Sequence, residues 1–127
     1  MKRVLFDAGV LIDFFRGQKQ AVELVLEYQD VAVLSSITVA ELFAGVRNDQ
    51  ETDDVEKYVE SVQVAPVSTD IAKLAGLYRK KYGKSHGVGI VDAIVAATAA
   101  TCVAELKTQN VKHYPMVKGL ASAYSKR

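Results

Sequence analysis

Three acidic residues and one amide stand where this sequence is expected to end a strand or begin a helix. Asp7 directly follows a short apolar run, Glu41 lies near the start of a helical segment, Asp92 opens another, and Asn110 follows a later strand. Because parallel strands end at the same edge of a sheet, these side chains can converge there. Carboxylate oxygens without a histidine or cysteine cluster favour Mg²⁺ or Mn²⁺ over zinc. Such a site suits phosphodiester hydrolysis, because a divalent ion polarises a phosphoryl oxygen and activates a water molecule.

Each of these residues also has an ordinary structural interpretation. Asp7 could bond the backbone of its own turn, and Glu41 could form a capping box with Thr38. Asp92 could be a first-turn acid favoured by the helix dipole, and Asn110 alone is typical of a turn. Taken together, carboxylates about 5 Å apart would repel by about 3 kcal/mol per pair, which a cation or a shared proton must offset. Neutralising one acid in metal-free buffer should therefore not lower stability.

Short apolar runs alternate with helical patterns along the chain. We expect buried strands at residues 4–6, 31–34 and 102–106, and an edge strand within 62–67, because Pro66 cannot donate to a central ladder. Helical patterns occupy residues 10–15, 21–28, 51–62 and 90–101, further helices start near Thr38 and at Ser68 or Thr69, and glycines mark a loop over 83–89. This alternation predicts an α/β fold, with a parallel sheet and helices on both faces.

Size and composition favour a single domain over residues 1–127. The chain has a mass of 13.8 kDa, and 50% of its residues are apolar and 24% charged, which suits one packed core. The single cysteine, Cys102, excludes an internal disulfide framework and suits a reducing cytoplasm; we expect its side chain to be buried. We find no apolar stretch long enough to span a bilayer and no signal-peptide core after Lys2 and Arg3, so we expect no membrane partner.

Charge is divided unevenly along the chain. Residues 1–70 contain 13 acids and 6 bases, whereas residues 71–127 contain 2 acids and 10 bases. The densest basic run precedes the segment that Asp92 opens and comprises Arg79, Lys80, Lys81 and Lys84. These cations could bind the phosphates of RNA, or they could form the solvated end of a helix, where positive charge is favoured.

The remaining candidate side chains favour ordinary roles. His86 and His113 are too few for a zinc site and are expected to be surface or loop residues. Asp13 is expected to cap its helix or to pair locally with Arg16. None of these residues enters the predicted site.

Four segments, in order along the chain, resemble the motifs of PIN-domain nucleases. The first is VLFDAGVLID at residues 4–13, the second SITVAEL at 36–42, the third GIVDAIVAATA at 89–99 and the fourth LKTQNVKHY at 106–114. The likeness covers nearly the whole chain, and the motifs are specific as a set. Size and motif spacing are most similar to those of the VapC-type toxins of prokaryotic toxin–antitoxin pairs.

This resemblance implies a three-layer PIN-like fold with a central parallel sheet of four to five short strands. It also implies an endoribonuclease that depends on Mg²⁺ or Mn²⁺, forms a homodimer in the cytoplasm and is inhibited by a cognate antitoxin protein. Asp7, Glu41 and Asp92 correspond to the acidic metal-binding residues of the family, and Asn110 occupies the fourth catalytic position. The implied substrate is RNA, which such enzymes cut at phosphodiester bonds.

Two features depart from the family pattern. Ala8 and Gly9 stand where a Thr or Ser, then an Asn or Ser, often follows the first Asp, so a hydroxyl or amide beside Asp7 is missing. Asn110 stands where Asp is frequent, and an amide adds no charge. Both features predict weaker metal binding, and they motivate the first of two other hypotheses. One is a non-catalytic module that binds RNA or a protein through its basic surface, and the other is a housekeeping RNA-processing nuclease without an antitoxin.

Overall fold

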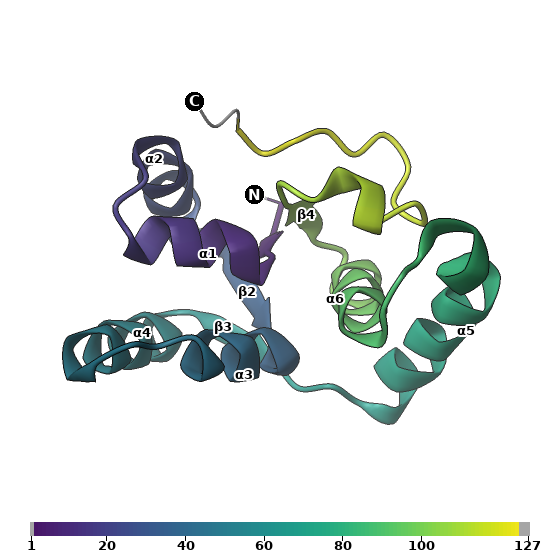
Figure 1. Ribbon diagram of the computed structural model, residues 1–127, viewed down its shortest axis with the longest axis horizontal. Helices are drawn as coiled ribbons and strands as arrows, with labels where there is room; N and C mark the ends of the chain where they lie inside the picture. Colours follow the sequence, from purple (N-terminus) through teal and green to yellow (C-terminus); the bar gives the residue numbers. More distant parts are fainter. Residues whose placement is uncertain (1, 125–127) are drawn as a thin grey trace.

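A computed structural model describes residues 2–124 as an α/β protein built around a four-stranded sheet (Figure 1). The strands are β1 (Val4–Phe6), β2 (Ala32–Ser35), β3 (Gln63–Ala65) and β4 (Glu105–Lys107). The helices are α1 (Ala8–Phe15), α2 (Lys19–Glu27), α3 (Ser36–Ala44), α4 (Asp49–Ser61), α5 (Thr69–His86) and α6 (Ile90–Thr101), with 3₁₀ turns at Gln29–Val31 and Val111–His113. The predicted fold class is confirmed, with four strands in the described part of the chain.

All neighbouring strands are parallel, in the order β3-β2-β1-β4. Val4 of the central strand β1 lies opposite Ala32 of β2 and Glu105 of β4. β3 lies at one edge of the sheet, as the following Pro66 predicts. Because the strands are parallel, their carboxyl ends all lie along the same border of the sheet, which we call its carboxyl edge. Asp7 directly follows β1 at this carboxyl edge.

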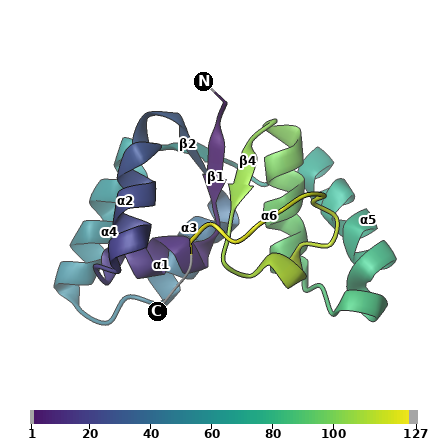
Figure 2. The ribbon, with the colours of Figure 1, turned by 90° about the horizontal axis from the view of Figure 1, so that it is seen from above.

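The two faces of the sheet are covered by different helices (Figures 1 and 2). Val4 and Phe6 belong to a core that α1, α2, α3 and α4 close, whereas Leu5 of the same strand packs against α6 on the opposite face. α5 packs on α6 through a further cluster that includes Ala75 and Ala93. Alternate residues of one strand therefore serve the two faces, which produces the expected three layers.

The predicted start of α3 was wrong. Thr38 and Glu41 do not form a capping box, because the helix already begins at Ser36. The Ser35 side chain caps it by accepting a hydrogen bond from the backbone N–H of Ile37 at 3.2 Å. Glu41 therefore lies one turn further into the helix than the sequence pattern indicates.

Two boundaries around α6 were also misplaced. α5 continues through the glycine at 83 to His86, so the predicted loop 83–89 is reduced to three residues. Gly87 ends α5 with φ at 64°, a left-handed conformation that glycine adopts without strain. β4 starts at Glu105, later than predicted, because Cys102 and Val103 form the turn out of α6, and the Cys102 side chain is only partly buried.

Beyond Tyr114 the described chain forms a tail without helix or strand up to residue 124. The tail runs from the side of α5 and α6 to the side of α1 and α2 (Figure 1). Within residues 2–124, none of the helices combines the length and the apolar character needed to cross a membrane.

Candidate active site

Asp7 lies at the junction of β1 and α1 and is held from both sides. Its Oδ1 caps α1 by accepting a hydrogen bond from the backbone N–H of Gly9 at 2.6 Å. Its Oδ2 accepts from Oγ1 of Thr108, just after β4, also at 2.6 Å. The residue is only 6% exposed, so its carboxylate has a fixed orientation. The turn role and the predicted site role of Asp7 are therefore compatible.

Tyr114 connects Asp7 with Asp92. Its Oη lies 3.2 Å from Oδ2 of Asp7 and 3.3 Å from Oδ1 of Asp92. Because a phenol carries one proton, it donates to one carboxylate at a time. Burial, and then the two negative charges, raises the pKa of Tyr114, so the hydroxyl remains a neutral donor. Two of the predicted site acids thus meet at one atom.

Asp92 lies in the first turn of α6, with 31% of its side chain exposed. Nδ1 of His113 lies 3.3 Å from its Oδ2 and pairs with it when the imidazole is protonated. Burial raises the pKa of Asp92, and the charge of Asp7 adds to this, whereas His113 and the hydrogen bond from Tyr114 act in the opposite direction. His113 is exposed, as predicted, but the sequence did not indicate that it faces a site acid.

Glu41 completes the set of acids from α3. Its side chain is half-buried, and this burial, followed by the charges of Asp7 and Asp92, raises its pKa. Among residues 2–124, no lysine or arginine forms an ion pair with any of these three acids. The site therefore carries negative charge whose partners in the described part of the chain are His113, the backbone N–H of Gly9 and the hydroxyls of Thr108 and Tyr114.

Asn110 lies beside the Asp7 turn. A Cβ atom built on Gly9 would lie 3.3 Å from Oδ1 of Asp7 and 3.8 Å from Nδ2 of Asn110, so the glycine permits this close arrangement. Ala8 and Gly9 lack the hydroxyl that the family pattern often places beside Asp7. Thr108, 101 positions later in the chain, supplies a hydroxyl that bonds Asp7 instead. Oγ1 of Thr108 also accepts from the backbone N–H of Asn110 at 3.0 Å. This single buried hydroxyl therefore orders two of the predicted site residues.

The basic run is exposed on the last turns of α5, at the residues Arg79, Lys80, Lys81 and Lys84. Residues 87–89 connect these turns to α6, which carries Asp92 in its first turn. The positive surface is thus separated from the candidate site by a short connection. Its exposure is compatible both with RNA binding and with a solvated helix end.

Sequence reasoning did not assign a role in the site to Thr108, Tyr114 or His113. All three follow β4 and therefore occur at the same edge of the sheet as Asp7. They also lie within the fourth segment that resembles the family. The rule that strand-exit residues gather at one edge indicates their general location, but it does not indicate that they contact Asp7 or Asp92.

The described residues contain no group of three His, Cys, Asp or Glu side chains placed to hold a metal ion unaided. Mg²⁺ does not require such a group, because it keeps several water molecules and is commonly bound by one or two carboxylates. Asp7 and Asp92 offer such a pair of oxygen ligands. The chemistry of the donors therefore suits a hard divalent cation.

We expect Glu41→Gln to stabilise the metal-free protein at neutral pH. A raised pKa means that the folded protein holds this proton more tightly than the unfolded chain, so the charged form of Glu41 costs stability. That cost is absent below the ordinary pKa of 4.5 and complete above the raised value. Thermal unfolding at pH 7 should show a gain on the order of a few degrees, which shrinks as the pH falls towards 4. Glu56→Gln, on the exposed face of α4, is the matched control, and a loss of stability in Glu41→Gln would contradict the repulsion argument.

The fold and the acids at the carboxyl edge of its sheet agree with one family. A family model for the PIN domain matches residues 4–110, most of the chain. The chain therefore belongs to the PIN domain family.

The chain is also similar to individual proteins and to solved structures. The chain is 35% identical over 125 residues to the protein named ribonuclease VapC19 of Mycobacterium tuberculosis, and the match covers 94% of this chain and 98% of the relative. Its structure is similar to a chain of a toxin–antitoxin complex from Klebsiella pneumoniae, with a TM-score of 0.82, 26% identity and coverage of 97% and 99% of the two chains. It shares its fold with a chain of the DNA-bound VapBC complex from Salmonella typhimurium, at a TM-score of 0.80, 21% identity and coverage of 94% and 96%.

Proposed function

We propose that this protein is a metal-dependent endoribonuclease that acts as the toxin of a type II toxin–antitoxin pair. The observation that carries the proposal is the junction of Asp7 and Asp92 at the hydroxyl of Tyr114, with Glu41 close enough for its pKa to respond to both. The similarity to a protein named as a ribonuclease, and to a chain of a toxin–antitoxin complex, supports the substrate class and the partner. The homodimer and the cytoplasmic location follow from the same resemblance and stay predictions.

Asp7 and Asp92 are the pair that would hold Mg²⁺ or Mn²⁺, with Glu41 as the third predicted ligand, close enough for its pKa to respond to both. Bound there, the ion would polarise a phosphoryl oxygen of RNA and lower the pKa of a water molecule. The acids repel one another and lack lysine or arginine partners within residues 2–124, so a cation would relieve an unfavourable charge distribution.

The surrounding side chains have separate tasks in this proposal. The backbone of Gly9 and the hydroxyl of Thr108 fix the two oxygens of Asp7. Tyr114 supplies a neutral hydroxyl between Asp7 and Asp92. Asn110 presents an amide beside them, where it can accept a hydrogen bond from a water molecule without adding charge.

The alternative of a non-catalytic binding module rested on Ala8, Gly9 and Asn110. Because Thr108 donates to Asp7, the first part of that argument loses its force, and catalysis is the better supported function. A housekeeping RNA-processing nuclease would use the same site. A small gene directly upstream that encodes a protein partner would favour the toxin.

Incubation of the purified protein with a mixed RNA pool tests the proposed reaction. We expect cleavage with Mn²⁺ or Mg²⁺, loss of cleavage on chelation, and recovery when the ion is added back. RNA binding without metal-dependent cleavage would instead support the non-catalytic module. Cleavage that persists unchanged in excess chelator would contradict the metal-dependent mechanism.

We propose that the exposed cations at the end of α5 bind RNA phosphates. Replacing Lys80 and Lys84 together by Gln should weaken RNA binding and reduce the slope of log affinity against log salt by about 0.7 per lost contact. Lys19 and Lys57, exposed on α2 and α4, provide a control pair with the same loss of charge. Binding is measured at several salt concentrations in an Asp92→Asn background to prevent cleavage. If the two pairs of substitutions weaken RNA binding equally, α5 contributes only net charge and no specific contact. If α5 makes specific contacts, replacing Arg79 and Lys81 as well should weaken RNA binding further.

A further inference from the structure

The C-terminal tail is attached at its start to the candidate site and at its end to the helix α1 beside that site. Tyr114, from which the tail starts, contacts Asp7 and Asp92. Near its end, Oη of Tyr124 donates to Oδ2 of Asp13 on α1 at 2.6 Å, and the ring packs against the core that α1 to α4 close. The tail therefore crosses from the side of α5 and α6 to the side of α1 and α2 (Figure 1), and a tyrosine bonds the protein at each of its ends.

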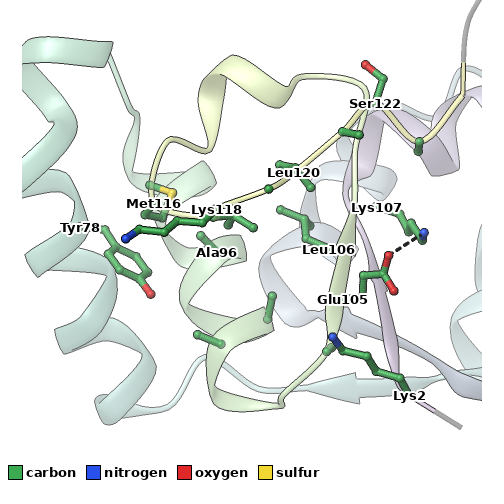
Figure 3. Close-up of a pocket in the computed structure, with 17 residues that line it drawn as sticks. Lys2, Tyr78, Ala96, Glu105, Leu106, Lys107, Met116, Lys118, Leu120 and Ser122 are labelled. Atoms are coloured by element: carbon green, nitrogen blue, oxygen red, sulfur yellow. Dashed lines mark hydrogen bonds and ion pairs between the residues drawn. The ribbon is translucent and has the colours of Figure 1, made fainter.

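Between these two points the tail borders an open cavity of about 600 Å³ (Figure 3). The cavity is lined by small residues of α6 such as Ala96, by Leu106 of β4, and by Met116 and Leu120 of the tail itself. The middle of the tail thus lies over an open cavity and leaves part of the space between itself, α6 and β4 unfilled. Its direct hydrogen bonds to the site region are concentrated at its two ends.

Gln109 binds the end of the tail in a clasp. The backbone N–H of Tyr124 donates to Oε1 of Gln109 at 3.0 Å, and Nε2 of Gln109 donates back to the carbonyl of Tyr124. Beside them, the backbone N–H of Ala123 donates to the carbonyl of Thr108 at 3.0 Å. Three hydrogen bonds therefore join two consecutive tail residues to the two residues that precede Asn110.

The segment held by this clasp is the one that orders the site. The Thr108 hydroxyl donates to Asp7 and accepts from the backbone N–H of Asn110, so a shift of this segment would move both partners. Tyr124 also bonds Asp13 on α1, the helix that Asp7 caps. Burial, the hydrogen bond and charge of Asp13 and then the charge of Asp7 raise the pKa of Tyr124, in agreement with its place next to the site.

We infer that Gln109 and Tyr124 are positioning residues, whose clasp fixes residues 108–110 against α1 and thereby orients the Asp7 carboxylate and the Asn110 amide. The consequence for catalysis rests on the proposed function, whereas the ordering of residues 108–110 does not. Neither residue is among the predicted metal ligands. The end of the tail therefore helps to position the site residues, although it lies far from Asp7 in the sequence.

The test compares Gln109→Ala, Tyr124→Phe and the control Ser122→Ala, an exposed residue of the same tail. In the metal-free protein, amide hydrogen exchange at Asn110 reports on the ordered segment. Gln109→Ala should speed this exchange by about tenfold or more, because the local opening that exposes the N–H becomes easier. It should also lower kcat and Mn²⁺ affinity by about 10- to 100-fold with KM nearly unchanged, as loss of support behind metal ligands does.

Tyr124→Phe keeps the backbone bonds between Gln109 and residue 124 but frees them from Asp13 on α1. Exchange at Asn110 should therefore also speed up, by less than in Gln109→Ala, and kcat should fall by at most about tenfold. Tyr124→Phe serves as the second variant if Gln109→Ala does not fold. Faster exchange at Asn110 in either variant, with exchange in Ser122→Ala unchanged, supports the clasp. Exchange at Asn110 that matches the wild type in Gln109→Ala, or in Tyr124→Phe where only that variant folds, overturns the inference. Wild-type protein that neither binds Mn²⁺ nor cleaves RNA would refute the proposed function instead, while the exchange measurement still decides the clasp.

Discussion

Replacing Asp7 or Asp92 by Asn is expected to lower metal-dependent RNA cleavage by at least about a thousandfold, because each change removes one of the paired charges that would hold the ion. Both substitutions keep the shape of the side chain. Asn at position 7 retains an oxygen for the N–H of Gly9, and the hydroxyls of Thr108 and Tyr114 can accept from its amide. The fold should therefore survive, and the loss should appear in the reaction.

Asp70→Asn is the matched control for this prediction. Asp70 occupies the first turn of α5 as Asp92 occupies that of α6, but it is exposed. Rates are measured with Mn²⁺ on a defined RNA, and thermal unfolding verifies that each variant is folded. Full activity in folded Asp7→Asn or Asp92→Asn would remove the acids from the mechanism. An equal loss in Asp70→Asn would show that the assay responds to charge in general.

The parts of the fold that local patterns specify could be predicted from the sequence. The helix Ile90–Thr101 has the bounds that its apolar, alanine-rich composition indicates, and Pro66 correctly predicts that β3 lies at an edge. Asp7 and Asp92 were identified because a strand end and a helix start are visible in the residues next to them. Their convergence followed from the parallel sheet, a property of topology that needs no side-chain detail.

The parts that depend on contacts between distant residues could not be predicted. Thr108 meets Asp7 across 101 positions and Tyr114 meets it across 107, and neither a threonine nor a tyrosine after a strand has a periodic signal. The departure at Ala8 and Gly9 therefore looked like a missing group, although a hydroxyl from the other end of the chain supplies it. The error at α3 is local: Ser35 and Thr38 both favour a helix start, and the extended backbone of Ser35 makes it the cap.

Thr108→Val is expected to lower kcat for RNA cleavage by about 10- to 100-fold, since the hydroxyl orders the predicted metal ligand Asp7 and is not itself a predicted ligand. Thr108 is 0% exposed, and valine has nearly the same shape, so the packing should change little. The change removes the donor to Asp7 and leaves the backbone N–H of Asn110 without its acceptor. Unfolding free energy should fall by about 1–3 kcal/mol, the cost of leaving buried polar groups unpaired.

Thr108→Ser separates the role of this hydroxyl from the role of its methyl group. Serine keeps the donor to Asp7 and the acceptor for Asn110, so it should restore most of kcat even though loss of the methyl group lowers stability. If the residue served packing alone, valine would be the milder change and serine the more harmful one. The order of the two variants in kcat, measured well below their unfolding temperatures, therefore decides whether Thr108 supports the site through its hydrogen bonds. A valine variant with wild-type kcat and Mn²⁺ affinity would show that Tyr114 and Gly9 suffice to hold Asp7.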